Sequence, residues 1–193
     1  MGVSVPNIRA LAKRIGKDDA LAEAIWNAGI HEARQLAPLI ANAATVSEAT
    51  LERWVCEIDS WDICDGLADF VAASPFGWTK VREWARRDEE FVRRAGFVVL
   101  ACLAVHDKAA TDEEFMAFFP DIRAASTDQR NFVKKAVNWA LRGIGKRNVT
   151  LNAAAIACGE QLRRDGSQPA RWIAADALRE LRSEAVQARL ERR

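Results

Sequence analysis

The chain repeats a segment of its own sequence, and this repeat restricts the possible folds more than any other feature. FVRRAGFVVL begins at Phe91, and FVKKAVNWAL begins at Phe132, 41 residues further along. Both segments combine an aromatic residue, a valine, two bases and an alanine with an apolar run. A period of about 40 residues is typical of HEAT and armadillo-like repeats, in which pairs of helices stack into a curved solenoid.

The remainder of the chain also favours an all-α fold. Apolar residues mostly recur three and four residues apart, no stretch alternates with a period of two, and most of the prolines fall between the periodic segments. We expect helices at roughly 6–15, 18–28, 30–42, 47–57, 60–73, 78–87, 89–105, 111–118, 128–145, 149–164 and 169–191. The short connections predict neighbouring antiparallel helices in one α-solenoid domain spanning residues 1–193.

Composition limits the class of protein and the kinds of site. Half of the 193 residues are apolar and 28% are charged, which is typical of a folded globular chain. No apolar run is long enough to cross a membrane, so a cytoplasmic protein is the expectation. A monomer is the default expectation for the oligomeric state. The four cysteines form no CxxC pair and there are only two histidines, so we expect buried thiols and no metal or other cofactor.

Charge is unevenly distributed, although the net charge is only +1. Residues 45–70 contain seven acids and one base, whereas residues 129–150 contain no acid. The bases of this second stretch are Arg130, Lys134, Lys135, Arg142, Lys146 and Arg147. Bases on successive helices are typical of a surface that binds a phosphate backbone, and a solvated outer surface is the alternative.

The sequence SWDICDG at residues 60–66 places a tryptophan among acids. On a helix over 60–73, one side carries the apolar residues Ile63, Leu67, Phe70 and Val71. Trp61 and Asp65 are four residues apart and lie nearly opposite that side, with Asp62 and Asp69 close by. We therefore expect Trp61 and Asp65 to face an opening and the other two acids to form a solvated flank. A second helix contact that buries Trp61 is the alternative.

Two later helices carry further candidates. Trp139 lies at the border between the apolar and basic sides of its helix, and Arg94 lies at the comparable border of a helix that is otherwise mostly apolar. Such an arginine either extends to the surface or is a partly buried partner for an anion.

Three segments together resemble one protein family. SWDICDG, FVRRAGFVVL and FVKKAVNWALRGIGKRN are similar to the signature segments of the AlkD-like DNA alkylation repair glycosylases, and the resemblance extends over roughly residues 2–150. The resemblance implies removal of N3- and N7-alkylated purines from duplex DNA without flipping of the base into a pocket. It implies Asp65 as the catalytic carboxylate, assisted by Trp61 and Trp139, and no cofactor.

The resemblance and the charge pattern also give a set of expected DNA contacts. These are Arg93, Arg94, Lys134, Lys135, Arg142, Lys146 and Arg147. Two alternatives stay open at this point: a relative that binds DNA structures without excising bases, and a HEAT-like scaffold that binds proteins. The acidic stretch and modest net charge favour these alternatives, whereas the joint presence of Trp61, Asp65, Arg94 and Trp139 favours the glycosylase.

Overall fold

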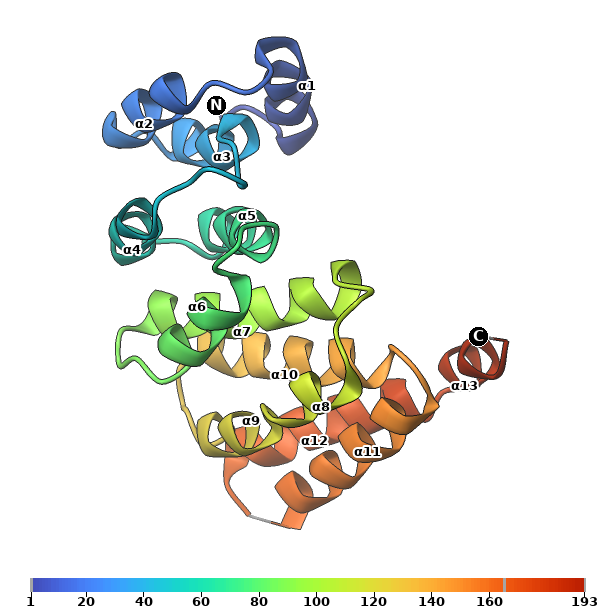
Figure 1. Ribbon diagram of the computed structural model, residues 1–193. Coiled ribbons are helices and arrows are strands. Elements are labelled where there is room, and N and C mark those ends of the chain that lie inside the picture. The colour runs from blue at the N-terminus through green and yellow to red at the C-terminus, as the bar shows by residue number, and fades with distance from the viewer. Residues whose placement is uncertain (1, 165, 193) are drawn as a thin grey trace.

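A computed structural model describes residues 2–164 and 166–192, and these residues form an α-solenoid (Figure 1). The helices are α1 (Val5–Ile15), α2 (Asp19–Asn27), α3 (His31–Ile40), α4 (Glu48–Cys56), α5 (Trp61–Ala72), α6 (Gly77–Trp84), α7 (Glu90–His106), α8 (Asp112–Met116), α9 (Phe119–Ala125), α10 (Asn131–Gly145), α11 (Val149–Arg164), α12 (Gln168–Leu181) and α13 (Glu184–Glu191). The expected all-α solenoid is confirmed, and within the described residues no helix is long and apolar enough to span a membrane.

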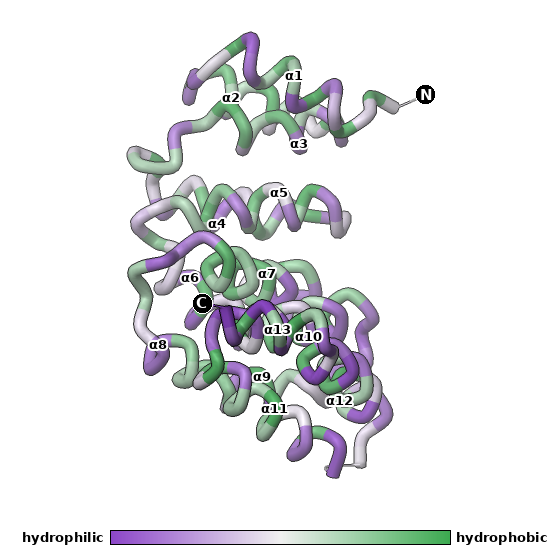
Figure 2. Tube along the Cα trace, turned by 90° about the vertical axis from the view of Figure 1, so that its right-hand side faces the viewer, coloured by the Kyte–Doolittle hydropathy of each residue, from purple (hydrophilic) through white to green (hydrophobic). Residues whose placement is uncertain are grey.

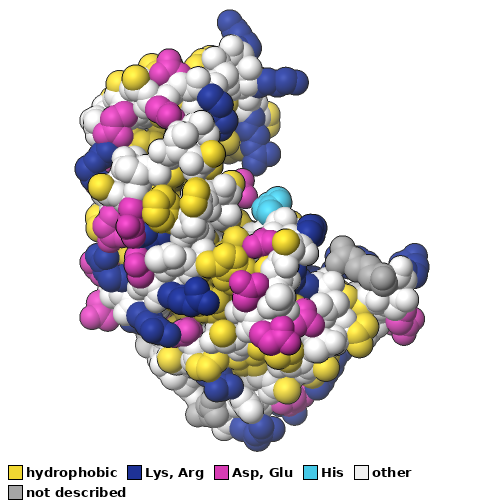
Figure 3. Space-filling view, viewed as in Figure 1, with side chains coloured by type: hydrophobic (Ala, Val, Ile, Leu, Met, Phe, Trp, Pro, Cys, Tyr) yellow, Lys and Arg dark blue, Asp and Glu magenta, His cyan; other side chains and the backbone are white. Residues whose placement is uncertain are grey.

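The helices form two columns. Helices α3, α5, α7, α10 and α12 contact one another in this order and make the inner column. Helices α2, α4, α6, α9 and α11 pack against them from outside, and the stack curves so that its right-hand side is hollow in Figure 3. Hydropathy alternates along the individual helices in Figure 2, as expected where each helix buries one side and exposes the other.

Helix α7 is the centre of the core, and it packs against α5, α6 and α10. Nearly all of its residues from Val92 to Ala104 are buried. Gly96 allows the close contact with α6, because a Cβ at this position would collide with the backbone of Ala85. The same packing fixes the position of Arg94, two residues earlier on α7.

Two expectations about the helices are wrong: no helix was expected between residues 118 and 128, and a single helix was expected over 169–191. A separate helix, α9, begins at Phe119. Pro120 is tolerated in its first turn, because the N–H group that proline lacks would have no partner within the helix at that position. The expected long C-terminal helix is divided in two, since Ser183 caps α13 by accepting a hydrogen bond from the Val186 amide. The division directs α13 away from the stack, toward the lip of the hollow (Figure 1).

Candidate functional site

A cleft of about 250 Å³ opens on the inner column, and three successive helices line it. Its walls are Trp61 and Asp65 from α5, Arg94 from α7, and Phe132, Lys135 and Trp139 from α10. The four residues singled out individually by their helical positions thus meet at one place. Phe132 was not among the candidate residues of the sequence, although it begins the second copy of the repeat.

The two tryptophans of the cleft are unusually exposed for indole side chains. Trp61 is 55% exposed and Trp139 is 36% exposed, whereas Trp26, Trp54 and Trp84 are fully buried elsewhere in the molecule. The reason lies in α5 and α10, whose opposite sides supply the core. The alternative of a second helix contact burying Trp61 is therefore wrong, and both indoles are available to a ligand.

Asp65 and Arg94 form an ion pair across two helices. The Nη2 group of Arg94 donates to Oδ1 of Asp65 over 2.6 Å, and its Nη1 group donates to the carbonyl of Phe132 over 2.9 Å. The guanidinium also lies 5.9 Å from the centre of the Phe132 ring, and Arg94 as a whole is only 5% exposed. Of the two expected environments for Arg94, the structure shows the buried partner of an anion.

The protein environment disfavours the charged form of Asp65. Burial raises the pKa of this carboxyl above its ordinary value of 3.8, the neighbouring charge of Asp62 adds to the increase, and the ion pair with Arg94 opposes it only in part. The adjacent Cys64 is buried, and burial raises the pKa of its thiol to about 12. Asp65 is thus the group in the cleft that can act as a base or a stabilising charge near neutral pH.

The two acids flanking this pair differ from each other. Asp62 accepts hydrogen bonds from Gln35 over 2.5 Å and from His31 over 2.8 Å, so it joins α5 to α3. The expectation of a solvated flank is wrong for Asp62, because α3 stacks directly on that part of α5. Asp69 is largely exposed, as expected, and it lies 3.4 Å from His106.

Most of the expected basic stripe is bound to other parts of the protein. Arg142 and Lys146 form ion pairs with Glu180 of α12, and Arg142 also pairs with Asp176. Arg147 donates to two backbone carbonyls, from Ala104 and Ala110. Helix α12 therefore neutralises Arg142 and Lys146, and its acids lie about one repeat further along the sequence. DNA contacts by these three bases stay predictions.

The other expected bases have different surroundings. Arg93 pairs with Asp88 and Asp128, and the amino group of Lys134 lies 4.7 Å from the centre of the Trp172 ring. Lys135 is exposed at the edge of the cleft, and with Arg94 it is one of two expected bases that line the site. Within residues 2–164 and 166–192, no cluster of His, Cys, Asp and Glu has the arrangement of a metal site.

Comparison with known proteins supplies the family. One solved structure is similar over 98% of this chain and 83% of its own length, with 20% sequence identity and a TM-score of 0.82. It is described as a new family of proteins related to the HEAT-like repeat DNA glycosylases, with affinity for branched DNA structures. A designed armadillo repeat protein matches with 15% identity over 90% of this chain and 91% of its own, at a TM-score of 0.40.

A search of the curated proteins found no match. The family model for DNA alkylation repair enzymes matches residues 1–181, which is nearly the whole sequence. Together with the solenoid architecture, this match shows that the chain belongs to the family of DNA alkylation repair enzymes.

Proposed function

We propose that this protein is a DNA glycosylase that removes N3- or N7-alkylated purines from duplex DNA by hydrolysing the N-glycosidic bond. One observation carries the proposal: a half-buried carboxylate, Asp65, is held by Arg94 between two exposed indoles in an open cleft. This combination suits a substrate that is positively charged and that gains further positive charge on the sugar as it reacts.

The reaction explains why an acid lies where a polyanion would bind. An alkylated purine carries a positive charge, so it leaves readily and the deoxyribose becomes oxocarbenium-like in the transition state. A carboxylate next to the sugar stabilises that charge and orients or deprotonates the attacking water. Arg94 donates to Oδ1 of Asp65, and Oδ2 accepts no hydrogen bond from the described residues, so it can face the sugar or the water.

The two tryptophans supply the complementary surfaces. Indole faces attract cations and pack against sugars, so Trp61 and Trp139 would hold the cationic nucleotide on either side of Asp65. The cleft of about 250 Å³ is open and smaller than the range of about 300–1,000 Å³ that is usual for pockets enclosing a ligand. Such a site suits the edge of a nucleotide that stays in the duplex better than a base turned out of it.

The proposal is tested by measuring base release from methylated duplex DNA. Purified protein should release 7-methylguanine or 3-methyladenine faster than these bases are lost spontaneously, without added metal. Binding to the methylated duplex combined with release at the spontaneous rate would contradict the proposal.

A second candidate function is binding of branched DNA without excision. It is favoured by the similar solved structure with a TM-score of 0.82, whose family has affinity for branched DNA structures, and by the pairing of Arg142 and Lys146 with α12. This function predicts tighter binding to a four-way junction than to a linear duplex, and no dependence of that binding on Asp65. Tighter binding to the junction than to the linear duplex, combined with base release at the spontaneous rate, would favour this function over the glycosylase.

A further inference from the structure

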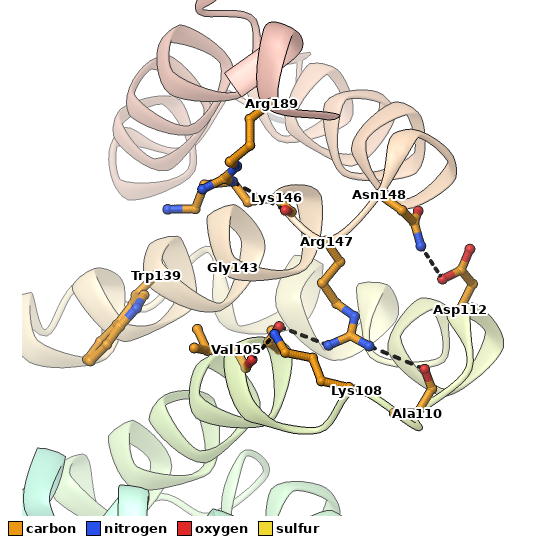
Figure 4. A pocket seen from close by; sticks show the side chains of 11 residues that line it. Val105, Lys108, Ala110, Asp112, Trp139, Gly143, Lys146, Arg147, Asn148 and Arg189 are labelled. Carbon is orange, nitrogen blue, oxygen red and sulfur yellow. Dashed lines mark hydrogen bonds between the residues drawn. The ribbon is translucent and has the colours of Figure 1, made fainter. Parts of the chain in front are cut away.

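A second pocket of about 460 Å³ lies on the other side of Trp139 from the cleft. It is bounded by the C-terminal ends of α7 and α10 and by α13 (Figure 4). Trp139 lines both the pocket and the cleft, so the two sites meet at this side chain.

The pocket collects cations from three separate parts of the chain. They are Lys108 after α7, Lys146 and Arg147 after α10, and Arg189 of α13. Two carboxylates are close to them: Asp112, which accepts from Asn148, and Glu180, which pairs with Lys146 over 2.7 Å. Four cations against two carboxylates give the pocket a positive local charge. In the cleft, two cations, Arg94 and Lys135, accompany the single carboxylate of Asp65.

Helix ends explain part of this arrangement. Cations are favourable near the C-terminus of a helix, where carbonyl groups lack partners, and Arg147 fills this role through Ala104 and Ala110. Lys108 bonds to the carbonyl of Val105, and Arg189 bonds to that of Lys146 over 3.3 Å. A lysine has three N–H donors and an arginine has five, so these single contacts leave donors for a ligand. Figure 4 shows Arg189 approaching from above and Lys108 from below.

We propose that this pocket binds a phosphodiester group of the DNA strand whose alkylated nucleotide occupies the cleft, so that Trp139 lies between the damaged nucleotide and a neighbouring phosphate. This inference rests on the proposed function. Its chemical basis is the division of charge: the carboxylate faces the sugar that becomes positive, and the cations face a group that is always negative. The phosphate contact would fix the register of the strand and thereby place the sugar against Asp65.

The test uses a duplex that contains a stable tetrahydrofuran abasic analogue, which offers no base to release. Binding is measured for the wild type and for Lys108→Gln, Arg189→Gln and the double variant, over a range of salt concentrations. Both side chains are exposed, so the variants should keep the melting temperature of the wild type. We expect the double variant to bind about fivefold more weakly, and the slope of log affinity against log salt to fall by about one.

The position of the phosphate that contacts the pocket is found by replacing single phosphates with uncharged linkages. A methylphosphonate replaces one phosphate at a time within two nucleotides on either side of the analogue. At one linkage the wild type should lose affinity, whereas the double variant should lose nothing further, because the contact is already absent. The matched control is Arg163→Gln on α11, which removes an exposed, ion-paired arginine outside the pocket.

Two results would overturn the inference: unchanged affinity of the double variant, or equal losses for wild type and double variant at every linkage. Neither result depends on base release, so failure of the pocket inference is distinguishable from failure of the glycosylase proposal. Base release together with equal effects of every methylphosphonate on the wild type and the double variant would support the glycosylase proposal and refute the phosphate-binding role of the pocket.

Discussion

Tryptophan and carboxylate meet on both sides of the solenoid, and the two arrangements differ. On the outer side, Trp84 of α6 is fully buried and its indole N–H donates to Glu52 of α4 over 2.9 Å. On the inner side, Trp61 is mostly exposed and the neighbouring Asp65 bonds to Arg94 instead. In the first pair the acid satisfies a buried indole, which is a structural role. In the second pair neither group needs the other for the fold.

The pKa values of the two acids shift in opposite directions. Burial acts to raise the pKa of Glu52, but hydrogen bonds from Trp84 and Arg87 and the charge of Lys80 outweigh it, so the pKa lies below 4.5. At Asp65 burial prevails over Arg94, so the pKa lies above 3.8. The fold thus favours the charged form of Glu52 and disfavours that of Asp65. A carboxyl group whose charged form is disfavoured by its surroundings is typical of a functional site.

The largest expected effect is a difference in the free energy of unfolding between variants of Trp84 and Trp61. Trp84→Ala removes a buried side chain and leaves a cavity, so it should lower the free energy of unfolding by about 3–5 kcal/mol. Trp61→Ala removes an exposed side chain and should change the free energy of unfolding by about 0.5 kcal/mol or less. Denaturant unfolding of both variants measures the difference, and comparable losses would remove the distinction between the two sides.

The second prediction concerns the acids. Glu52→Gln should cost about 1 kcal/mol of unfolding free energy at pH 7, a value kept small because Glu52 is partly exposed. A lowered pKa contributes stability above the unfolded pKa, so this difference should disappear as the pH falls through the folded pKa of Glu52.

The corresponding change at Asp65 should behave in the opposite way. A raised pKa contributes stability below the unfolded pKa, and this contribution is lost as the pH rises. Asp65→Asn should therefore leave the stability at pH 7 within about 1 kcal/mol of the wild type. A large loss of stability in Asp65→Asn with little loss in Glu52→Gln would mean that Asp65, and not Glu52, has the structural role.

Arg94 provides a sharper test through the pH dependence of base release. The proposed reaction needs Asp65 as a carboxylate, so release should decline on acidification with a midpoint above the ordinary value of 3.8. Arg94 opposes the raised pKa, so Arg94→Met should move this midpoint to higher pH. Circular dichroism of the variant controls for folding. A midpoint that stays in place or moves to lower pH would exclude Arg94 as the partner that tunes Asp65.

The smallest expected effect compares two bases of α10. Lys135→Gln should reduce the salt dependence of DNA binding by about one phosphate contact, because Lys135 is exposed at the cleft. Arg142→Gln should change it less, because this charge is already paired with Asp176 and Glu180. Equal changes would mean that DNA displaces the acids of α12 from Arg142.

The helices and the positions of Trp61 and Asp65 could be predicted from the sequence because both depend on local periodicity. The side of α5 that Ile63 and Leu67 occupy determines where the other residues point. The neutralisation of Arg142 could not be predicted, because its partners belong to the next layer of the solenoid. The helical position of Arg94 allowed either a surface side chain or a partly buried partner for an anion. The packing of α5 on α7, which brings Asp65 to Arg94, decided between them.

The proposed division of roles assigns the catalysis to Asp65 and the maintenance of the fold to Glu52. Its most direct test is the single-turnover rate of 7-methylguanine release from methylated duplex DNA by wild type, Asp65→Asn and Glu52→Gln, all at saturating protein. We predict a loss of at least about 100-fold for Asp65→Asn and a rate within about twofold of the wild type for Glu52→Gln. Equal rates for all three proteins, or a loss confined to Glu52→Gln, would contradict the claim.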